Sequence, residues 1–80
     1  MSKTDRDELQ TGLRQAELYY TAHPGSPSAV RHPTLTVRAG TWIALLGPGL
    51  EGGIVGFGNS VEAALRAFDA RYLTFLRTAV

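Results

Sequence analysis

Glycines, histidines, serines and a few acids are the residues of this chain that could do chemistry, and a glycine-rich turn has the most specific pattern. Residues 47–52 read Gly-Pro-Gly-Leu-Glu-Gly and match G-x-G-x-x-G, the fingerprint that binds the pyrophosphate of a dinucleotide. The fingerprint binds phosphate only where it opens a helix whose backbone N–H groups point at the ligand. Here an apolar run with strand character, residues 54–58, follows instead. We therefore predict a hairpin loop and no cofactor.

The titratable and nucleophilic side chains do not form a recognisable site either. His23 and His32 flank a proline-rich segment, and no third or fourth metal ligand is evident beside them. Ser26 and Ser28 lie in that same segment, where a nucleophile would be poorly held. We predict no catalytic, metal-binding or cofactor-binding residues, and we expect that the chain is not an enzyme.

Composition narrows the class of protein further. Eighty residues allow one small domain, residues 1–80, and eight basic against seven acidic residues give a net charge of +1. That balance is too weak for a strong nucleic-acid footprint. The polar start MSKTDRDELQ is unlike a signal peptide, and no apolar run approaches the roughly 20 residues that span a bilayer. The absence of cysteine fits a reducing compartment, so we expect a cytoplasmic protein that acts away from membranes.

Two helices are predicted at the ends of the chain. In residues 4–22, Leu9, Leu13, Ala16 and Tyr20 fall on one helical face, and mid-helix Gly12 implies that this helix depends on tertiary packing. Residues 23–33 hold three prolines and are predicted to be a loop. Residues 60–78 are predicted to form a helix with a continuous apolar stripe, and its N-terminal signal is either Ser60 as the N-cap or Asn59 with Glu62 as a capping-box variant.

Three strands are predicted between the helices, at 34–39, 41–46 and 54–58. The connections are short, so we expect an antiparallel meander with the second strand central. Gly56 and Gly58 in the third strand are interpreted as allowing close packing. The predicted fold class is α+β: helix, three-stranded sheet over residues 34–58, helix (αβββα), with both helices on one face of the sheet.

Excess apolar surface is the strongest functional signal in the sequence. Two helices cover one face of such a sheet, yet the central strand has bulky apolar residues on both faces. Exposed apolar patches mark partner or self-association sites. An alternative is that the proline-rich segment folds over the open face. The candidate partner-binding residues are Trp42, Ile43, Leu45 and Leu73, together with the basic residues Arg31 and Arg38.

Two resemblances bear on function. Residues 58–65, Gly-Asn-Ser-Val-Glu-Ala-Ala-Leu, resemble the strand-to-helix signature of HicB-type antitoxins, and the resemblance spans residues 42–68. The segments 42–46, 53–58 and 64–69 resemble short orphan proteins of phages and prophages in GC-rich bacteria. Small phage proteins of this kind often block a host defence complex by binding it.

These observations favour a non-enzymatic, protein-binding inhibitor from a phage or mobile element. It would occlude the surface of a host defence complex, with an anti-CRISPR as one form. Three alternatives stay open at this point. They are a nucleic-acid-binding module that uses Arg31, Arg38 and the arginines of the last helix, a HicB-like antitoxin partner, and a homodimer formed through the open sheet face.

Overall fold

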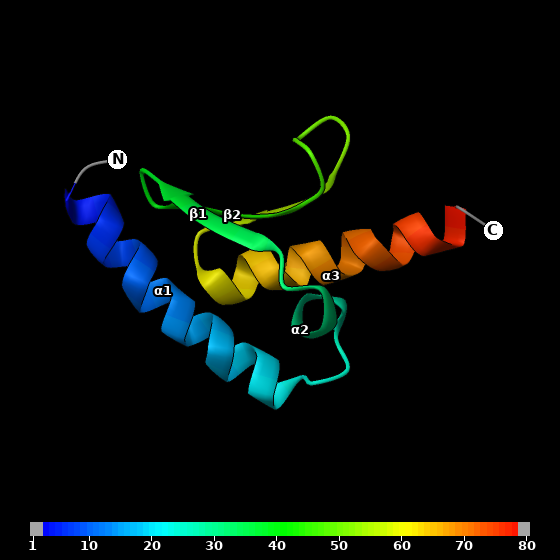
Figure 1. Cartoon of the computed structure of the whole chain (residues 1–80), viewed down its shortest axis with the longest axis horizontal. Coiled ribbons are helices and arrows are strands. Elements are labelled where there is room, and N and C mark those ends of the chain that lie inside the picture. The colour runs from blue at the N-terminus through cyan, green and yellow to red at the C-terminus, as the bar shows by residue number, and fades with distance from the viewer. Residues whose placement is uncertain (1–2, 79–80) are drawn as a thin grey trace.

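The computed structural model describes residues 3–78 and has the predicted α+β order with one additional short helix (Figure 1). Its elements are α1 Lys3–Ala22, α2 Pro27–Arg31, β1 Thr34–Arg38, β2 Thr41–Leu46, β3 Ile54–Gly58 and α3 Val61–Thr78. Within the described residues, no helix combines the length and apolarity needed to cross a membrane.

The sheet is an antiparallel meander in the order β1-β2-β3, as the short connections predicted. A two-residue turn joins β1 to β2, with Ala39 at φ 48° and Gly40 at φ 79°. Positive φ at both central positions is the type I′ geometry, whose twist matches that of the flanking strands. The turn pairs Arg38 with Thr41, so the first strand ends one residue earlier than predicted.

The backbone of helix α3 packs directly against the backbone of β3. A Cβ added at Gly56 would overlap the α3 backbone at Phe68 and Ala64, and one added at Gly58 would overlap the backbone of Ala64. These glycines therefore allow the helix to pack directly on the strand, which confirms their interpretation as packing residues. The N-terminus of α3 is capped by Ser60, whose Oγ accepts from the Ala63 N–H at 3.1 Å.

Helix α1 covers the same face of the sheet through Gly12 and Ala16. A Cβ on Gly12 would overlap the ring of Trp42, so the glycine is required by the close approach of the indole. Figure 1 shows α1 and α3 on one side of the sheet and loop 47–53 rising on the other. The core is the layer between sheet and helices. Its buried apolar residues are Ala16, Leu35, Val37, Trp42, Ala44, Val61, Ala64, Leu65 and Phe68.

The structure corrects the prediction that residues 23–33 are only a loop, because α2 lies within them. Ser26 is its N-cap and accepts from the Ala29 N–H, while Pro27 occupies the first turn, where its missing N–H is harmless. His32 ends the helix in the left-handed conformation, at φ 52°. Helix α2 packs on α3 and α1, so this segment lies on the helix side and leaves the other sheet face uncovered.

Candidate functional site

The structure distributes the six candidate contact residues over three places. Ile43 and Leu45 lie on the sheet face that no helix covers, and Arg38 extends from the end of the neighbouring strand. Leu73 and Arg31 line one groove between α2 and α3. The structure corrects the prediction that Trp42 binds a partner. Its side chain points to the helix side, is only 7% exposed and belongs to the core.

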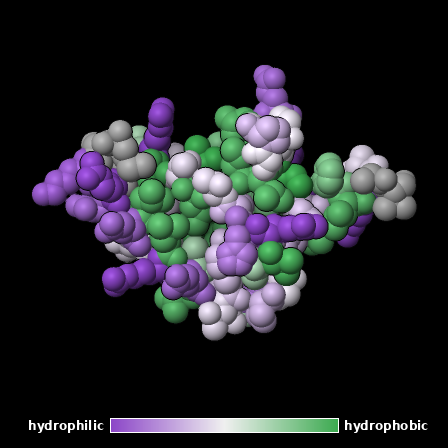
Figure 2. Space-filling view, viewed as in Figure 1, coloured by the Kyte–Doolittle hydropathy of each residue, from purple (hydrophilic) through white to green (hydrophobic). Residues whose placement is uncertain are grey.

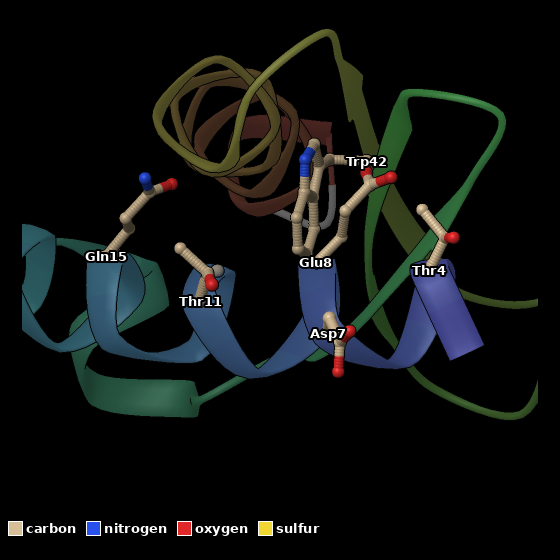
Figure 3. Close-up of a pocket in the computed structure, with 7 residues that line it drawn as sticks. Thr4, Asp7, Glu8, Thr11, Gln15 and Trp42 are labelled. Atoms are coloured by element: carbon tan, nitrogen blue, oxygen red, sulfur yellow. The ribbon is translucent and has the colours of Figure 1, made fainter.

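Trp42 has this position because β2 alternates. Its neighbour two residues on is Ala44, which is fully buried, and both side chains therefore point at the helices. Figure 3 shows the indole standing on α1 beside Glu8 and Thr11. The hollow at this contact has a volume of about 400 Å³ and includes the carboxylates of Asp7 and Glu8. Among the described residues, no group of three or more His, Cys, Asp or Glu side chains is placed to hold a metal ion.

The open sheet face is defined here as the apolar side chains Ile43, Leu45, Val55 and Phe57. The register pairs Ile43 with Phe57 and Leu45 with Val55, so the four form two adjacent rows. Phe57 is 51% exposed and the other three are partly exposed. The outward residues of β1 beside them are threonines, at 34 and 36. Val55 and Phe57 were absent from the candidate residues, although the alternation of β3 already placed them together.

A second exposed apolar surface lies where α3 extends past the sheet (Figure 1). We call it the α3 end and define it by Val30, Tyr72, Leu73, Phe75 and Leu76. All of these except Tyr72 are between 44% and 64% exposed, and Tyr72 is partly buried. A groove of about 280 Å³ runs along it between α2 and α3. Figure 2 shows hydrophobic side chains along this projecting end and on the upper part of the molecule beside the loop.

Three arginines, Arg31, Arg71 and Arg77, border the α3 end. At about 100° per residue, its α3 side chains cover an arc of roughly 160°, with Arg71 at one margin and Arg77 at the other. Arg31 reaches in from α2, and its Nε donates to the Tyr72 hydroxyl at 2.9 Å. Residues 70–78 and α2 contain no acid, and the adjacent Asp69 lies on the same helical face but accepts from the Tyr19 hydroxyl and the Ser28 N–H. The exposed charged side chains beside this surface are therefore positive.

Asp69 binds three helices together and is the polar centre of the helix layer. Its carboxylate accepts from the Tyr19 hydroxyl of α1 at 2.7 Å and from the Ser28 N–H of α2 at 2.8 Å. Burial, and then the hydrogen bond to Asp69, raise the pKa of Tyr19 to about 12. A tyrosine that holds its proton so tightly is a poor general base at neutral pH. We interpret this network as structural: the carboxylate pairs with the N–H of buried Ser28 in the first turn of α2, which has no partner within the helix, and fixes α1 against α3.

The remaining sequence candidates for chemistry are held apart. His23 stacks on Tyr19 with ring centroids 4.6 Å apart, and His32 contacts Tyr20 at 5.0 Å. The glycine-rich segment 47–52 connects β2 to β3, as expected from the strand pattern that follows it, and does not open a helix. The described residues therefore present two exposed apolar surfaces, the open sheet face and the α3 end.

No protein-family model matches this chain, and neither a curated protein nor a solved structure matches it.

Proposed function

We propose that this chain is a non-enzymatic protein-binding module that docks its α3 end on an acidic, partly apolar surface of another protein. The observation that carries the proposal is the combination of exposed apolar side chains with arginines at both margins of one helix. Exposed apolar patches of this kind mark interaction sites. The positive border selects a partner with negative charge, because complementary charge speeds encounter and excludes partners of like charge.

Arg31 supplies the specific element of this surface. Its Nε is engaged by Tyr72, which leaves the two terminal guanidinium nitrogens available at the mouth of the groove. A guanidinium held in this way recognises a carboxylate with two parallel hydrogen bonds. Leu73 and Leu76 beside it accept an apolar side chain. A helix or extended segment that carries one acid next to bulky apolar residues fits these features.

The resemblance to short phage and prophage proteins makes the proposal more specific. It implies that the protein comes from a phage or mobile element and inhibits a host defence complex by covering one of its surfaces. An 80-residue chain can act by occlusion without any catalytic group. A target built to bind nucleic acid offers a positive surface, so the acidic patch that we propose would lie elsewhere on the complex.

A nucleic-acid-binding module is the second candidate, because the three arginines that border the α3 end, Arg31, Arg71 and Arg77, could contact phosphates. Two features favour a protein partner. The arginines are separated by a wide apolar surface, and Arg38 lies at the far end of β1 from Arg31. A further arginine of α3, Arg66, is paired with Glu62 at 3.3 Å.

Affinity capture from a host lysate, with and without nuclease, separates the two candidates. The tagged chain is compared with Leu73→Asp and Arg31→Glu, and with Leu18→Asp as the matched control, since Leu18 is 71% exposed on α1. We expect a nuclease-resistant partner that is lost with both α3-end variants and kept with the control. Loss of every partner after nuclease, together with steep weakening by salt, would instead establish the nucleic-acid module. A partner that tolerates Leu73→Asp would refute docking through the α3 end.

A further inference from the structure

The open sheet face has a charge pattern that complements itself. Arg38 stands at one end of the face, beside the turn from β1 to β2. Glu51 is in loop 47–53 at the opposite end, and the face between them is apolar or threonine. A face with one positive end and one negative end matches a copy of itself turned end for end. The α3 end lacks this property, because two copies would bring arginines against arginines.

The rows of the sheet have the same symmetry. Ala44 pairs with Gly56, and the Ile43–Phe57 row lies on one side of this pair while the Leu45–Val55 row lies on the other. A two-fold axis across the strands at the Ala44 row therefore exchanges the two apolar rows. The row of Thr41 and Arg38 lies three residues from Ala44 in one direction, and Gly47, where the loop begins, lies three residues away in the other.

The position of loop 47–53 favours this two-fold axis across the strands over a two-fold axis along the strands. Figure 1 shows the loop rising above the face at its own end, whereas the turn at Ala39 and Gly40 at the other end stays low. A two-fold axis along the strands would bring the loops of two copies against each other and hold the sheets apart. An axis across the strands places each loop over the low end of the other copy.

We propose that a second copy of this chain covers the open sheet face, forming an isologous pair in which the two sets of strands run end for end. In this pair Ile43 packs on Leu45 of the partner subunit, and Phe57 packs on Val55 of the partner subunit. The loop that holds Glu51 of the partner subunit covers the end of the face at which Arg38 stands. It lies diagonally across from Arg38, because β1 packs on β1 of the partner subunit and the loop joins β2 to β3. Each contact occurs twice, as two-fold symmetry requires. The proposal is independent of the proposed function, which uses the α3 end.

The size of the face sets the strength of the pair. Three strands spaced about 4.8 Å apart, with five residues at about 3.3 Å each, give a footprint of about 14 by 17 Å. Stable protein interfaces bury about 800 Å² per partner. The footprint of roughly 240 Å² is smaller than this even when side chains, the loop and Arg38 enlarge it, so the pair belongs with weak, transient interfaces. We therefore expect a reversible dimer with a Kd on the order of 10–100 µM.

Sedimentation equilibrium of the full chain, from about 1 µM to about 1 mM, brackets this Kd. We expect the mass to rise from 8.6 kDa toward twice that value as concentration increases. Phe57→Lys should keep the chain monomeric over the whole range, because it places a charge in an apolar row of the interface, against Val55 of the partner subunit. Leu18→Lys, on α1, is the matched control and should leave dimerisation unchanged. A chain that is monomeric at the highest concentration, or a dimer that is indifferent to Phe57→Lys, overturns the proposal.

A charge-reversal cycle tests the end-for-end arrangement and does not disturb the apolar centre. Arg38→Glu and Glu51→Arg should each raise the Kd about threefold to tenfold, since each puts like charges opposite one another. The double variant should return the Kd to near the original value. All these side chains are exposed, so folding is checked by far-ultraviolet circular dichroism. Dimers that respond to Phe57→Lys but show no recovery in the double variant overturn the arrangement.

Discussion

Replacing Gly12 by alanine tests the packing of α1 sharply, because helix propensity and packing predict opposite signs. In the interior of a helix, alanine is more favourable than glycine by about 1 kcal/mol. At this position, however, the new Cβ would overlap three atoms of the Trp42 ring. Trp42 is 7% exposed and belongs to the core, and three of its ring atoms would be overlapped at once, so the cost lies toward the upper part of the range of about 1–3 kcal/mol for overpacking. We expect a net loss of about 2 kcal/mol in the free energy of unfolding.

Urea unfolding followed by circular dichroism and by Trp42 fluorescence measures this loss. Gly25→Ala is a control, because a Cβ there meets no atom within 4 Å, and it should change stability by less than about 0.5 kcal/mol. In a Trp42→Leu background the clash is gone, and Gly12→Ala should then stabilise by up to about 1 kcal/mol. An increase in stability from Gly12→Ala in the unmodified chain would refute the close contact between the indole and α1.

Three further predictions follow from the contacts that fix the helix layer. Gly56→Ala should destabilise by more than about 2 kcal/mol in urea unfolding, since its Cβ meets helix backbone that cannot rotate away; a change of under about 1 kcal/mol would contradict the close packing of α3 on β3. Asp69→Asn should lower the Tm by roughly 6–15 °C in a thermal melt, because it removes the charge from an acceptor shared by Tyr19 and Ser28; a Tm within about 2 °C of the unmodified chain would argue against the network. The folded chain holds the Tyr19 proton to a pKa of about 12, whereas the unfolded chain releases it near 10, so the Tyr19 contribution is fully present below about pH 10 and is lost as pH rises toward 12. Tyr19→Phe should reduce this loss and remove the latest phase of the tyrosinate absorbance titration, and an unchanged titration would contradict the assignment.

Most of the fold could be predicted because each element has a local signal. Ser60 before an apolar stripe marked the start of α3, and the cap bond to Ala63 confirms it. The short connections around 40 and 47–53 could only join neighbouring antiparallel strands, and the sheet order follows from that. Helix α2 was missed, although Ser26 followed by Pro27 is an N-terminal signal. Five residues are too few to show helical periodicity.

The face on which Trp42 lies could not be read from the hydrophobic pattern, because β2 is apolar at every second position on both sides. Size was the useful signal. Ala44, Gly56 and Gly58 are all small and lie on one face, and only a helix backbone packed at short range needs a row of small residues. Trp42 is two residues from Ala44 in the same strand, so its side chain points to the same face and lies under the helices. The same reasoning assigns the bulky set at 43, 45, 55 and 57 to the open face.

The apolar stripe of α3 is longer than the fold requires, and geometry explains why. Eighteen helical residues extend about 27 Å, whereas a five-residue strand extends about 17 Å, so the helix runs roughly 10 Å past β3. The first half of the stripe, from Val61 to Phe68, is buried under the sheet. The second half has exposed apolar side chains, and α2 supplies only one wall of its groove. Core packing therefore does not account for the exposed side chains of Leu73, Phe75 and Leu76, and the proposed docking on a partner would give them a role.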